Sequence, residues 1–440
     1  MHPKALVAAC AELVEQNLKF EHPADAVVAR FFREHRSLGP RERLTLAEAV
    51  FMVLRKRLLF EHFAVWGSGA KARRLAILGL ARSLAAGSSP ASGASTRSSR
   101  EFLRAGLSDV ECQWLDRCEQ VNEADLFERH RHNLPEWLAQ ALKAQLGSEF
   151  WSLVAALDQS AALDLRVNTY LAKRDEVLSE LAADGLVATP TPYSPWGLRL
   201  PDKTALSQRA VFTRGAVEIQ DEGSQLLALL ADAKRGEMVA DFCAGAGGKT
   251  LALGAAMRNT GRLYAFDTSG HRLESLKGRL ARSQLSNVHP VVIAHERDER
   301  LRRLTGKFDR VLVDAPCSGL GTLRRNPDLK WRQTEESISE FAAKQTEILA
   351  AAARLLKPGG RLVYGTCSIL DQENEQVAQE FGASHSAFVP INVADTLSAL
   401  KVSNAESICS GAPSANFLRL WPHRHGTDGF FAAVWVRMSN

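Results

Sequence analysis

The chain has 440 residues, 45% of them hydrophobic and 24% charged, a composition typical of a globular protein of two or three domains. Its seven cysteines include no C-x-x-C pair, which argues against a disulfide framework and a cysteine zinc site. The net charge of +5 is uneven, since residues 1–100 carry +8 and the rest carry −3. This excess favours a polyanionic partner, with a merely solvated basic surface as the alternative.

The N-terminal stretch does not read as a targeting segment. Glu12 and Glu15 interrupt its apolar residues, so we expect no secretory signal peptide. No run approaches the roughly 18 apolar residues that a membrane-spanning helix needs. A cytoplasmic protein that binds no membrane is therefore expected, with no metal, and we expect a monomer.

Residues 1–145 predict an all-helical domain. Apolar residues recur at helical spacing from Leu6 to Leu18 and again from Leu46 to Leu58. Pro23 and Pro40 stand where helices are expected to start, because a first turn has no use for the donor that proline lacks. The Ser/Gly/Ala-rich residues 87–100 predict a flexible insertion.

Residues 146–222 predict a helical linker followed by a small α/β module, with a strand at 163–170 and a helix ending near Gly185. Residues 223–440 then alternate strands and helices. Continuous apolar strands indicate a doubly wound, Rossmann-like α/β fold, and a closing hairpin is expected near the end. A Ser337-x-x-Glu340 capping box predicts the start of a helix. The sequence K-P-G-G at 357–360 is expected to end that helix. The strands are expected at 238–242, 263–266, 291–294, 310–313 and 361–364.

The run D-F-C-A-G-A-G-G-K-T over 241–250 resembles a phosphate-binding loop at first sight. That loop needs a glycine five residues before Gly248, and Cys243 stands there, which argues against an ATPase or GTPase. The glycines instead suit close approach of a ligand without a phosphate chain, such as S-adenosylmethionine. Asp267, at the end of the next strand, is placed to bind ribose hydroxyls, although NAD enzymes share this pattern.

Two further strand ends carry D-A-P-C-S-G-L-G-T and G-T-C-S-I, which place Asp314, Cys317 and Cys367 at one sheet edge. Each cysteine alone could be a small buried residue. Spacing does not decide which thiol would attack a substrate.

These motifs resemble the RNA cytosine-C5 methyltransferases, and the helical N-terminal region is similar to the antitermination factor NusB. Together they resemble the bacterial 16S rRNA methyltransferases with a NusB-like domain, the Fmu or Sun family. The resemblance implies an RRM-like middle module and a class I methyltransferase domain that uses S-adenosylmethionine. The family's glycine loop usually reads C-A-A-P-G-G-K-T, and here Gly245 and Ala246 replace its alanine and proline.

The resemblance also implies roles for residues. Cys367 would add to C6 of cytosine, Cys317 would assist release of the methylated product, and Asp314 would donate a proton or hydrogen bond toward N3. Cofactor contacts would come from Asp267, from Asp314 and from Asp298 at the adenine amine, with Glu296 as the alternative for that last contact. The loop residues Cys243, Ala244, Gly245, Ala246, Gly247, Gly248 and Lys249 would line the methionine part.

The expected substrate is 16S rRNA or another structured RNA with an accessible cytosine, because the base must leave its stack to react. Arg324, Arg325 and Lys330 would contact the RNA strand, with a solvated loop as the alternative. His423 and His425 are interpreted as turn residues. The alternative function is a non-catalytic RNA-binding or antitermination factor on a methyltransferase scaffold.

Overall fold

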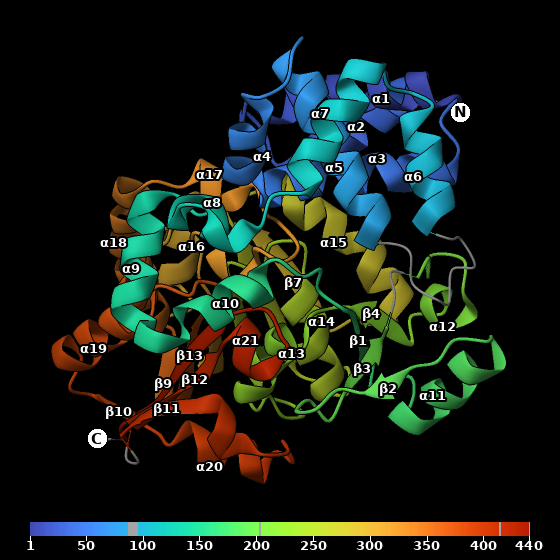
Figure 1. Ribbon diagram of the computed structural model, residues 1–440. Coiled ribbons are helices and arrows are strands. Elements are labelled where there is room, and N and C mark those ends of the chain that lie inside the picture. The colour runs from blue at the N-terminus through green and yellow to red at the C-terminus, as the bar shows by residue number, and fades with distance from the viewer. Residues whose placement is uncertain (87–95, 202–203, 413–414, 440) are drawn as a thin grey trace. The chain divides into compact units, whose positions relative to one another are not determined.

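The computed structural model describes residues 1–86, 96–201, 204–412 and 415–439 (Figure 1). The chain forms two compact units, one of Met1–Gln159 with Leu323–Glu335 and one of Ser160–Thr322 with Glu336–Asn440. Of the predicted insertion, residues 87–95 lie outside the described residues. Residues from Thr96 onward instead form a helix, because they open the amphipathic segment that ends at Arg104.

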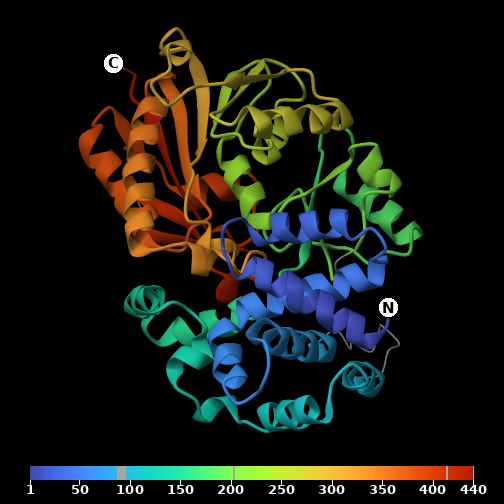
Figure 2. The same cartoon turned by 90° about the horizontal axis from the view of Figure 1, so that it is seen from above.

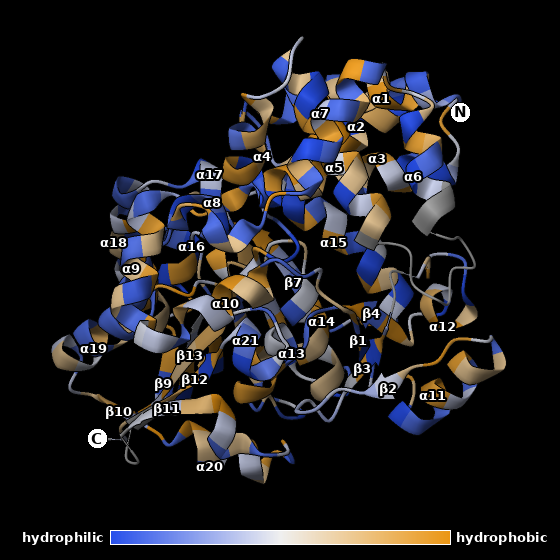
Figure 3. Ribbon diagram, viewed as in Figure 1, coloured by the Kyte–Doolittle hydropathy of each residue, from blue (hydrophilic) through white to orange (hydrophobic). Residues whose placement is uncertain are grey.

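The first unit is built of helices, of which those in residues 1–159 are coloured from blue through cyan to blue-green in Figure 2. The two predicted apolar stripes are confirmed, since Leu6 and Cys10 of α1 and Leu46 and Val50 of α3 are buried in one core. Hydrophobic and hydrophilic residues share these helices (Figure 3), as amphipathic packing requires. The helices are α1 (Pro3–Asn17), α2 (Ala24–Glu34), α3 (Pro40–Arg55), α4 (Arg57–Ala64), α5 (Lys71–Ala86), α6 (Thr96–Arg104), α7 (Asp109–Glu119), α8 (Glu128–His132), α9 (Glu136–Leu146) and α10 (Phe150–Leu157).

A later segment of the chain, 323–335 with the short helix α17 (Leu329–Arg332), completes this helical unit. Asp328 Oδ2 accepts a hydrogen bond from the backbone N–H of Ala24, at the start of α2, at 3.2 Å. Trp331 Nε1 donates to the Leu54 carbonyl at 2.7 Å. Hydrogen bonds to both α2 and α3 therefore fix this segment within the unit.

Lys330 in the same segment is only 5% exposed, and its Nζ donates to the Arg55 carbonyl at 2.9 Å. Burial lowers the pKa of Lys330 to about 7, because the charged ammonium loses its hydration. Asp158 opposes this shift, whereas the positive charges of Arg55 and Lys56 add to it.

We expect Lys330→Met to remove a pH dependence of stability. Between pH 7 and the ordinary lysine pKa of about 10.4, the unfolded chain binds a proton that the folded protein does not. The free energy of unfolding of the parent protein should therefore rise with pH over this range, and Lys330 contributes at most about 1.4 kcal/mol per pH unit to that rise. Urea unfolding of parent and variant at pH 7, 8 and 9 measures this slope. Lys71→Met, at a lysine whose side chain is 58% exposed, serves as the control, and an equal slope in parent and Lys330→Met would contradict the prediction.

The second unit begins with a small four-stranded antiparallel sheet in the order β2-β3-β1-β4. The predicted strand and helix of this module are confirmed as β1 and α11. Leu165 and Leu198 of the sheet pack on Val177 and Leu181 of α11. The elements are β1 (Leu163–Val167), α11 (Arg174–Ala183), β2 (Thr189–Pro190), β3 (Gly197–Leu200), α12 (Ala210–Thr213) and β4 (Val217–Ile219).

A nine-stranded sheet forms the body of this unit. Its parallel part has the order β9-β8-β5-β6-β7, and the antiparallel strands β13, β12 and β11 extend it beyond β9. The strands are β5 (Met238–Phe242), β6 (Arg262–Asp267), β7 (Val288–Val292), β8 (Phe308–Asp314), β9 (Leu356–Thr366), β10 (Phe388–Pro390), β11 (Cys409–Ala412), β12 (Ala415–Leu420) and β13 (Phe430–Arg437). The expected closing hairpin is β12 and β13.

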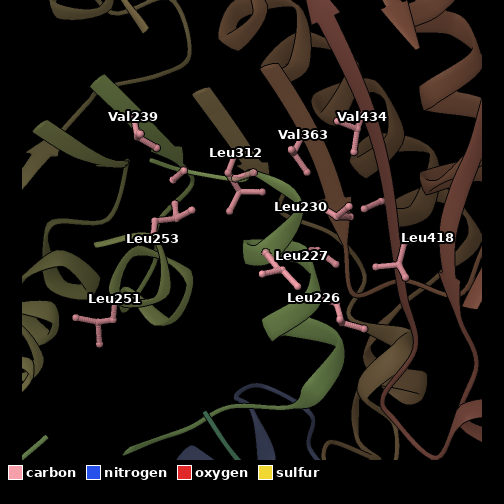
Figure 4. Packing of buried hydrophobic residues seen from close by; sticks show 14 of the residues in the cluster. Leu226, Leu227, Leu230, Val239, Leu251, Leu253, Leu312, Val363, Leu418 and Val434 are labelled. Carbon is pink, nitrogen blue, oxygen red and sulfur yellow. The ribbon is translucent and has the colours of Figure 1, made fainter. Parts of the chain in front are cut away.

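Helices cover both faces of this sheet, which confirms the doubly wound class. Val239, Leu312 and Val363 belong to one hydrophobic cluster. Residues adjacent to them along the same strands belong to a second hydrophobic cluster, because successive side chains of a strand point to opposite faces. Figure 4 shows side chains of α13 in the first cluster beside those strand residues. The helices are α13 (Glu222–Leu230), α14 (Gly248–Ala256), α15 (Gly270–Ser283) and α20 (Val393–Ala399) on the first cluster, α16 (Glu299–Arg302), α18 (Glu335–Ala353) and α19 (Glu375–Ser384) on the second, and α21 (Pro422–His425).

Three local predictions are wrong. The third strand lies at Val288–Val292 rather than at 291–294, because Val288 pairs with Leu263 and an edge strand tolerates Pro290. Helix α18 already begins at Glu335, so Ser337 is not its N-cap. Residues 357–360 lie within β9, which starts at Leu356, and do not end the helix.

Candidate active site

Loops that follow β5, β8 and β9 meet at the carboxyl edge of the parallel strands. Strand β8 pairs with both β5 and β9, and Asp314 stands in register with Gly365. The residues after β8 and after β9 therefore leave the sheet side by side. The backbone N–H of Gly321 donates to the Cys367 carbonyl at 2.8 Å, which joins the two loops directly.

The two cysteines that the sequence places at this edge do lie together. The sulfur atoms of Cys317 and Cys367 are 3.4 Å apart, within hydrogen-bond distance, and both side chains are half-buried. The hydrogen bond to Cys367 and burial raise the pKa of Cys317 well above its usual range. Since a second thiolate this close to the first is strongly disfavoured, the pair keeps a proton on Cys317.

An ion pair lies at the same edge. Lys249 Nζ donates to Asp314 Oδ2 at 2.8 Å, and the lysine side chain is 10% exposed against 31% for the aspartate. Burial acts to lower the pKa of Lys249, but attraction to Asp314 and the hydrogen bond between them outweigh it and raise that pKa. A thiolate on Cys367 adds to this attraction, so the ammonium lies where it can favour a negative charge on that sulfur.

The glycine loop between β5 and α14 adopts a backbone that few side chains tolerate. Residues 243, 245 and 247 have φ angles of 73°, 57° and 84°. A Cβ on Gly247 would lie 2.1 Å from Leu276 Cδ1, so only glycine fits there. Ala246 stands in place of the usual proline, and its carbonyl accepts a hydrogen bond from Arg279 Nη1 at 2.7 Å. This hydrogen bond from Arg279 fixes the backbone at Ala246, the position where a proline ring would otherwise restrict it.

Asp267 also fixes this loop from the end of β6. Its Oδ2 accepts the backbone N–H of Gly245 at 2.7 Å, and its Oδ1 accepts that of Ser269 at 2.7 Å. The carboxylate is 6% exposed and each oxygen retains a further lone pair. The geometry is therefore compatible with the predicted contact to ribose hydroxyls.

A buried acceptor beneath the loop tests whether these residues suit a cofactor. Asp241 is fully buried, and burial raises its pKa to about 7. Its Oδ2 accepts the Thr250 hydroxyl at 2.6 Å, whereas its Oδ1 has no hydrogen-bond partner among the described residues. A Cβ on Gly245 would meet no atom within 4 Å. An open glycine turn above an unsatisfied acceptor fits a ligand with hydrogen-bond donors.

The two candidates for the adenine contact have different surroundings. Asp298 is half-buried, caps α16, and accepts the N–H groups of Ala294 and Arg300 at 2.8 and 2.9 Å, which lower its pKa. Glu296 is 9% exposed and accepts Lys344 Nζ at 2.7 Å. Burial would raise the pKa of Glu296, but the bond to Lys344 outweighs it. The adenine contact stays a prediction for both.

The predicted RNA-contacting residues belong to the helical unit. The Lys330 ammonium is buried on the Arg55 carbonyl, so its placement does not support a phosphate contact. Arg324 is 9% exposed, and its carbonyl accepts Arg55 Nη2 at 2.7 Å, whereas Arg325 is half-buried. Only Arg325 retains substantial exposure among the three. His423 and His425 lie in α21 between β12 and β13.

Sequence reasoning missed Glu373, in the short 3-10 turn Asp371–Glu373 after the Cys367 loop. Its carboxylate is fully buried and accepts hydrogen bonds from Ser318 and Ser368. The polar run D-Q-E-N-E around it is typical of a solvated turn, and the only usable signal was its position just after T-C-S. Among the described residues, no cluster of three or more metal-binding side chains and no helix suited to crossing a membrane is present.

Comparisons with known proteins agree with this geometry. Residues 228–436 match the family "16S rRNA methyltransferase RsmB/F", and 134–207 match the "Methyltr_RsmF/B-like, ferredoxin-like domain". A probable ribosomal RNA small subunit methyltransferase B from Synechocystis sp. is 32% identical over 93% of this chain and 94% of its own. The Yersinia enterocolitica ribosomal RNA small subunit methyltransferase B is 32% identical over 72% and 71%. The crystal structure of PH0851 is 28% identical and superposes with a TM-score of 0.77 over 99% of both chains.

Proposed function

Since this chain belongs to the RsmB/F family of 16S rRNA methyltransferases, we propose how its own residues divide the work of methylating cytosine. The protein is an S-adenosylmethionine-dependent rRNA methyltransferase that acts on C5 of cytosine. Membership decides against the non-catalytic RNA-binding alternative. The observation that carries the residue assignment is the pair of sulfurs 3.4 Å apart beside the Lys249–Asp314 ion pair.

Cys367 is the proposed nucleophile. C5 of cytosine reacts poorly until a thiolate adds to C6 and makes C5 electron-rich. Burial and the hydrogen bond to Cys367 raise the pKa of Cys317, so Cys317 keeps its proton and donates it as a hydrogen bond. The Cys317 S–H therefore lies within hydrogen-bond distance of the Cys367 sulfur, where it can stabilise negative charge on that sulfur.

Asp314 and Lys249 act on the opposite side of the ring. Addition at C6 moves negative charge toward N3, where a proton or hydrogen-bond donor lowers the energy of the adduct. The predicted donor is Asp314, which must itself bind a proton before it can donate, and the Lys249 ammonium, 2.8 Å from Asp314 Oδ2, places a positive charge beside it. We therefore assign the two residues one joint role.

The loop 243–249 and Asp267 hold the cofactor. S-adenosylmethionine supplies an electrophilic methyl group on its sulfonium. The positive φ angles at residues 243, 245 and 247 bring the backbone of the turn close to the ligand, and Arg279 and Asp267 keep it in place. Asp298 or Glu296 contacts the adenine amine.

Cys317 assists the final elimination. After methyl transfer, a solvent base takes the C5 proton, the electrons of that C–H bond form the C5–C6 double bond, and the C6–S bond breaks with its electron pair leaving on the Cys367 sulfur. The Cys317 S–H lies within hydrogen-bond distance of that sulfur and stabilises the departing thiolate. Arg324 and Arg325 stay candidates for contacts with the RNA strand, whose target cytosine must be unstacked to reach the site.

The function is tested by supplying purified protein with S-adenosylmethionine carrying a labelled methyl group and with unmodified 16S rRNA. We expect the label in 5-methylcytidine after digestion to nucleosides, and bisulfite sequencing then locates the base. 23S rRNA serves as the control RNA. Label found on N4 of cytosine, or on another base, would overturn the proposal.

A further inference from the structure

A buried carboxylate lies beneath both cysteine-bearing loops. Glu373 Oε1 accepts the backbone N–H of Ser318 at 2.8 Å, and its Oε2 accepts the hydroxyls of Ser318 and Ser368, each at 2.5 Å. Ser318 and Ser368 directly follow Cys317 and Cys367. One side chain therefore contacts the neighbour of each reacting thiol.

This carboxylate depends on the two loops for its stability. A buried anion is strongly unfavourable unless hydrogen bonds replace its hydration. Glu373 is fully buried, and its four donors are neutral groups. Three of them come from the serines, and the fourth is Gln345 Nε2 at 3.1 Å. Moving either loop would leave the anion short of donors, so the buried charge holds both loops in place.

Neighbouring polar groups extend this arrangement to the other side of each cysteine. Gln345 Nε2 also donates to the carbonyl of Pro316, just before Cys317, at 2.9 Å. The Thr366 hydroxyl, just before Cys367, donates to Asn374 Oδ1 at 2.5 Å, and Asn374 Nδ2 donates to the Ser368 carbonyl at 3.1 Å. Both cysteines are thus held from both sides.

We propose that Glu373 is a positioning residue that sets the spacing of the two sulfurs. The inference rests on the proposed roles of Cys317 and Cys367, since one sulfur bonds to C6 and the other must reach that bond when it breaks. Tyr364, buried in β9, donates its hydroxyl to the Glu373 carbonyl at 2.5 Å and thereby also fixes the backbone of the turn.

The charge of Glu373 has a second effect. The hydrogen bond to Cys367 and burial are the largest causes of the raised pKa of Cys317, and the negative charge of Glu373 adds to them. Its removal should let Cys317 ionise at lower pH. This gives a readout that a purely structural role would leave unchanged.

The first test is Glu373→Gln. The glutamine amide has the same shape as the carboxylate, but its NH₂ group would face groups that now donate to Glu373. One of the two cysteine-bearing loops must therefore move. Because small misplacements of reacting groups can cost about 10²-fold, kcat should fall by about that factor while KM for S-adenosylmethionine stays near the parent value. In a Cys367→Ala background, the pH midpoint for alkylation of Cys317 should move down. Glu375→Gln is the matched control, because that half-buried carboxylate pairs with Arg419 and its loss should leave kcat near the parent value.

The serine variants separate the two loops and are less disruptive to folding. Ser318→Ala should slow product release, so that a denaturation-resistant protein–RNA adduct builds up. Ser368→Ala should slow adduct formation instead. A parental kcat in Glu373→Gln, or the same step slowed in both serine variants, would overturn the positioning role. Failure of the cysteine roles is recognised separately, because Cys367→Ala would then retain activity.

Discussion

Cys367→Ala should abolish methyl transfer while S-adenosylmethionine still binds with parental affinity. The thiol at this position is the proposed nucleophile, and enzymes that lose a covalent nucleophile lose activity on the order of 10⁴-fold or more. The cofactor-holding groups come from the loop after β5 and from Asp267, so their geometry does not involve the Cys367 side chain. Initial rates on 16S rRNA and calorimetric titration of the cofactor measure the two effects.

The matched control for this variant is Cys409→Ala. Cys409 lies half-buried in β11, and burial raises its pKa to about 12, so its thiol stays neutral and its loss should leave the rate near the parent value. With RNA that contains 5-fluorocytosine, the parent should form a stable crosslink within the peptide 364–370. Retained activity of Cys367→Ala, or a crosslink elsewhere, would refute the assignment of the nucleophile.

Cys317→Ala should trap the protein on its RNA. Adduct formation and methyl transfer require Cys367, but the departing sulfur loses the S–H group that lies 3.4 Å away. We therefore expect about one methyl group transferred per protein molecule, a strongly reduced steady-state rate, and a protein–RNA band that survives denaturing electrophoresis.

The double variant Cys317→Ala/Cys367→Ala controls for nonspecific retention of RNA. It should show no such band, because no thiol remains to bond to C6. A single Cys317→Ala variant that turns over normally, with no retained RNA, would rule out the release role. Both results can be obtained from the same gel with labelled RNA.

Much of this site could be predicted from the sequence because its parts stand at strand ends. Apolar runs located β5, β6 and β8, and parallel topology then required Asp314, Cys317 and Cys367 to share one edge. The register of Asp314 with Gly365 and the 3.4 Å sulfur distance agree with that prediction. The assignment of roles to the two thiols remains a prediction, to be decided by the variants above.

Other features could not be predicted, because they depend on contacts between distant parts of the chain. Glu373 lies in a polar run that suits solvent, and only the folded loops supply its donors. Lys330 comes a few residues after the cysteine motif and was predicted to contact RNA, yet its side chain is buried and donates to the Arg55 carbonyl within the helical unit. The edge strand β7 carries His289 and Pro290, which obscured its true start at Val288.

The path of segment 323–335 bears on how this protein could be dissected. The chain passes from one unit to the other after residues 159, 322 and 335, so no single cut separates them. A fragment starting at residue 160 would keep that segment but lose the Leu54 and Arg55 carbonyls that accept from Trp331 and Lys330. The N-terminal helices are therefore not a removable accessory, and a shortened enzyme would need those thirteen residues replaced by a neutral connector.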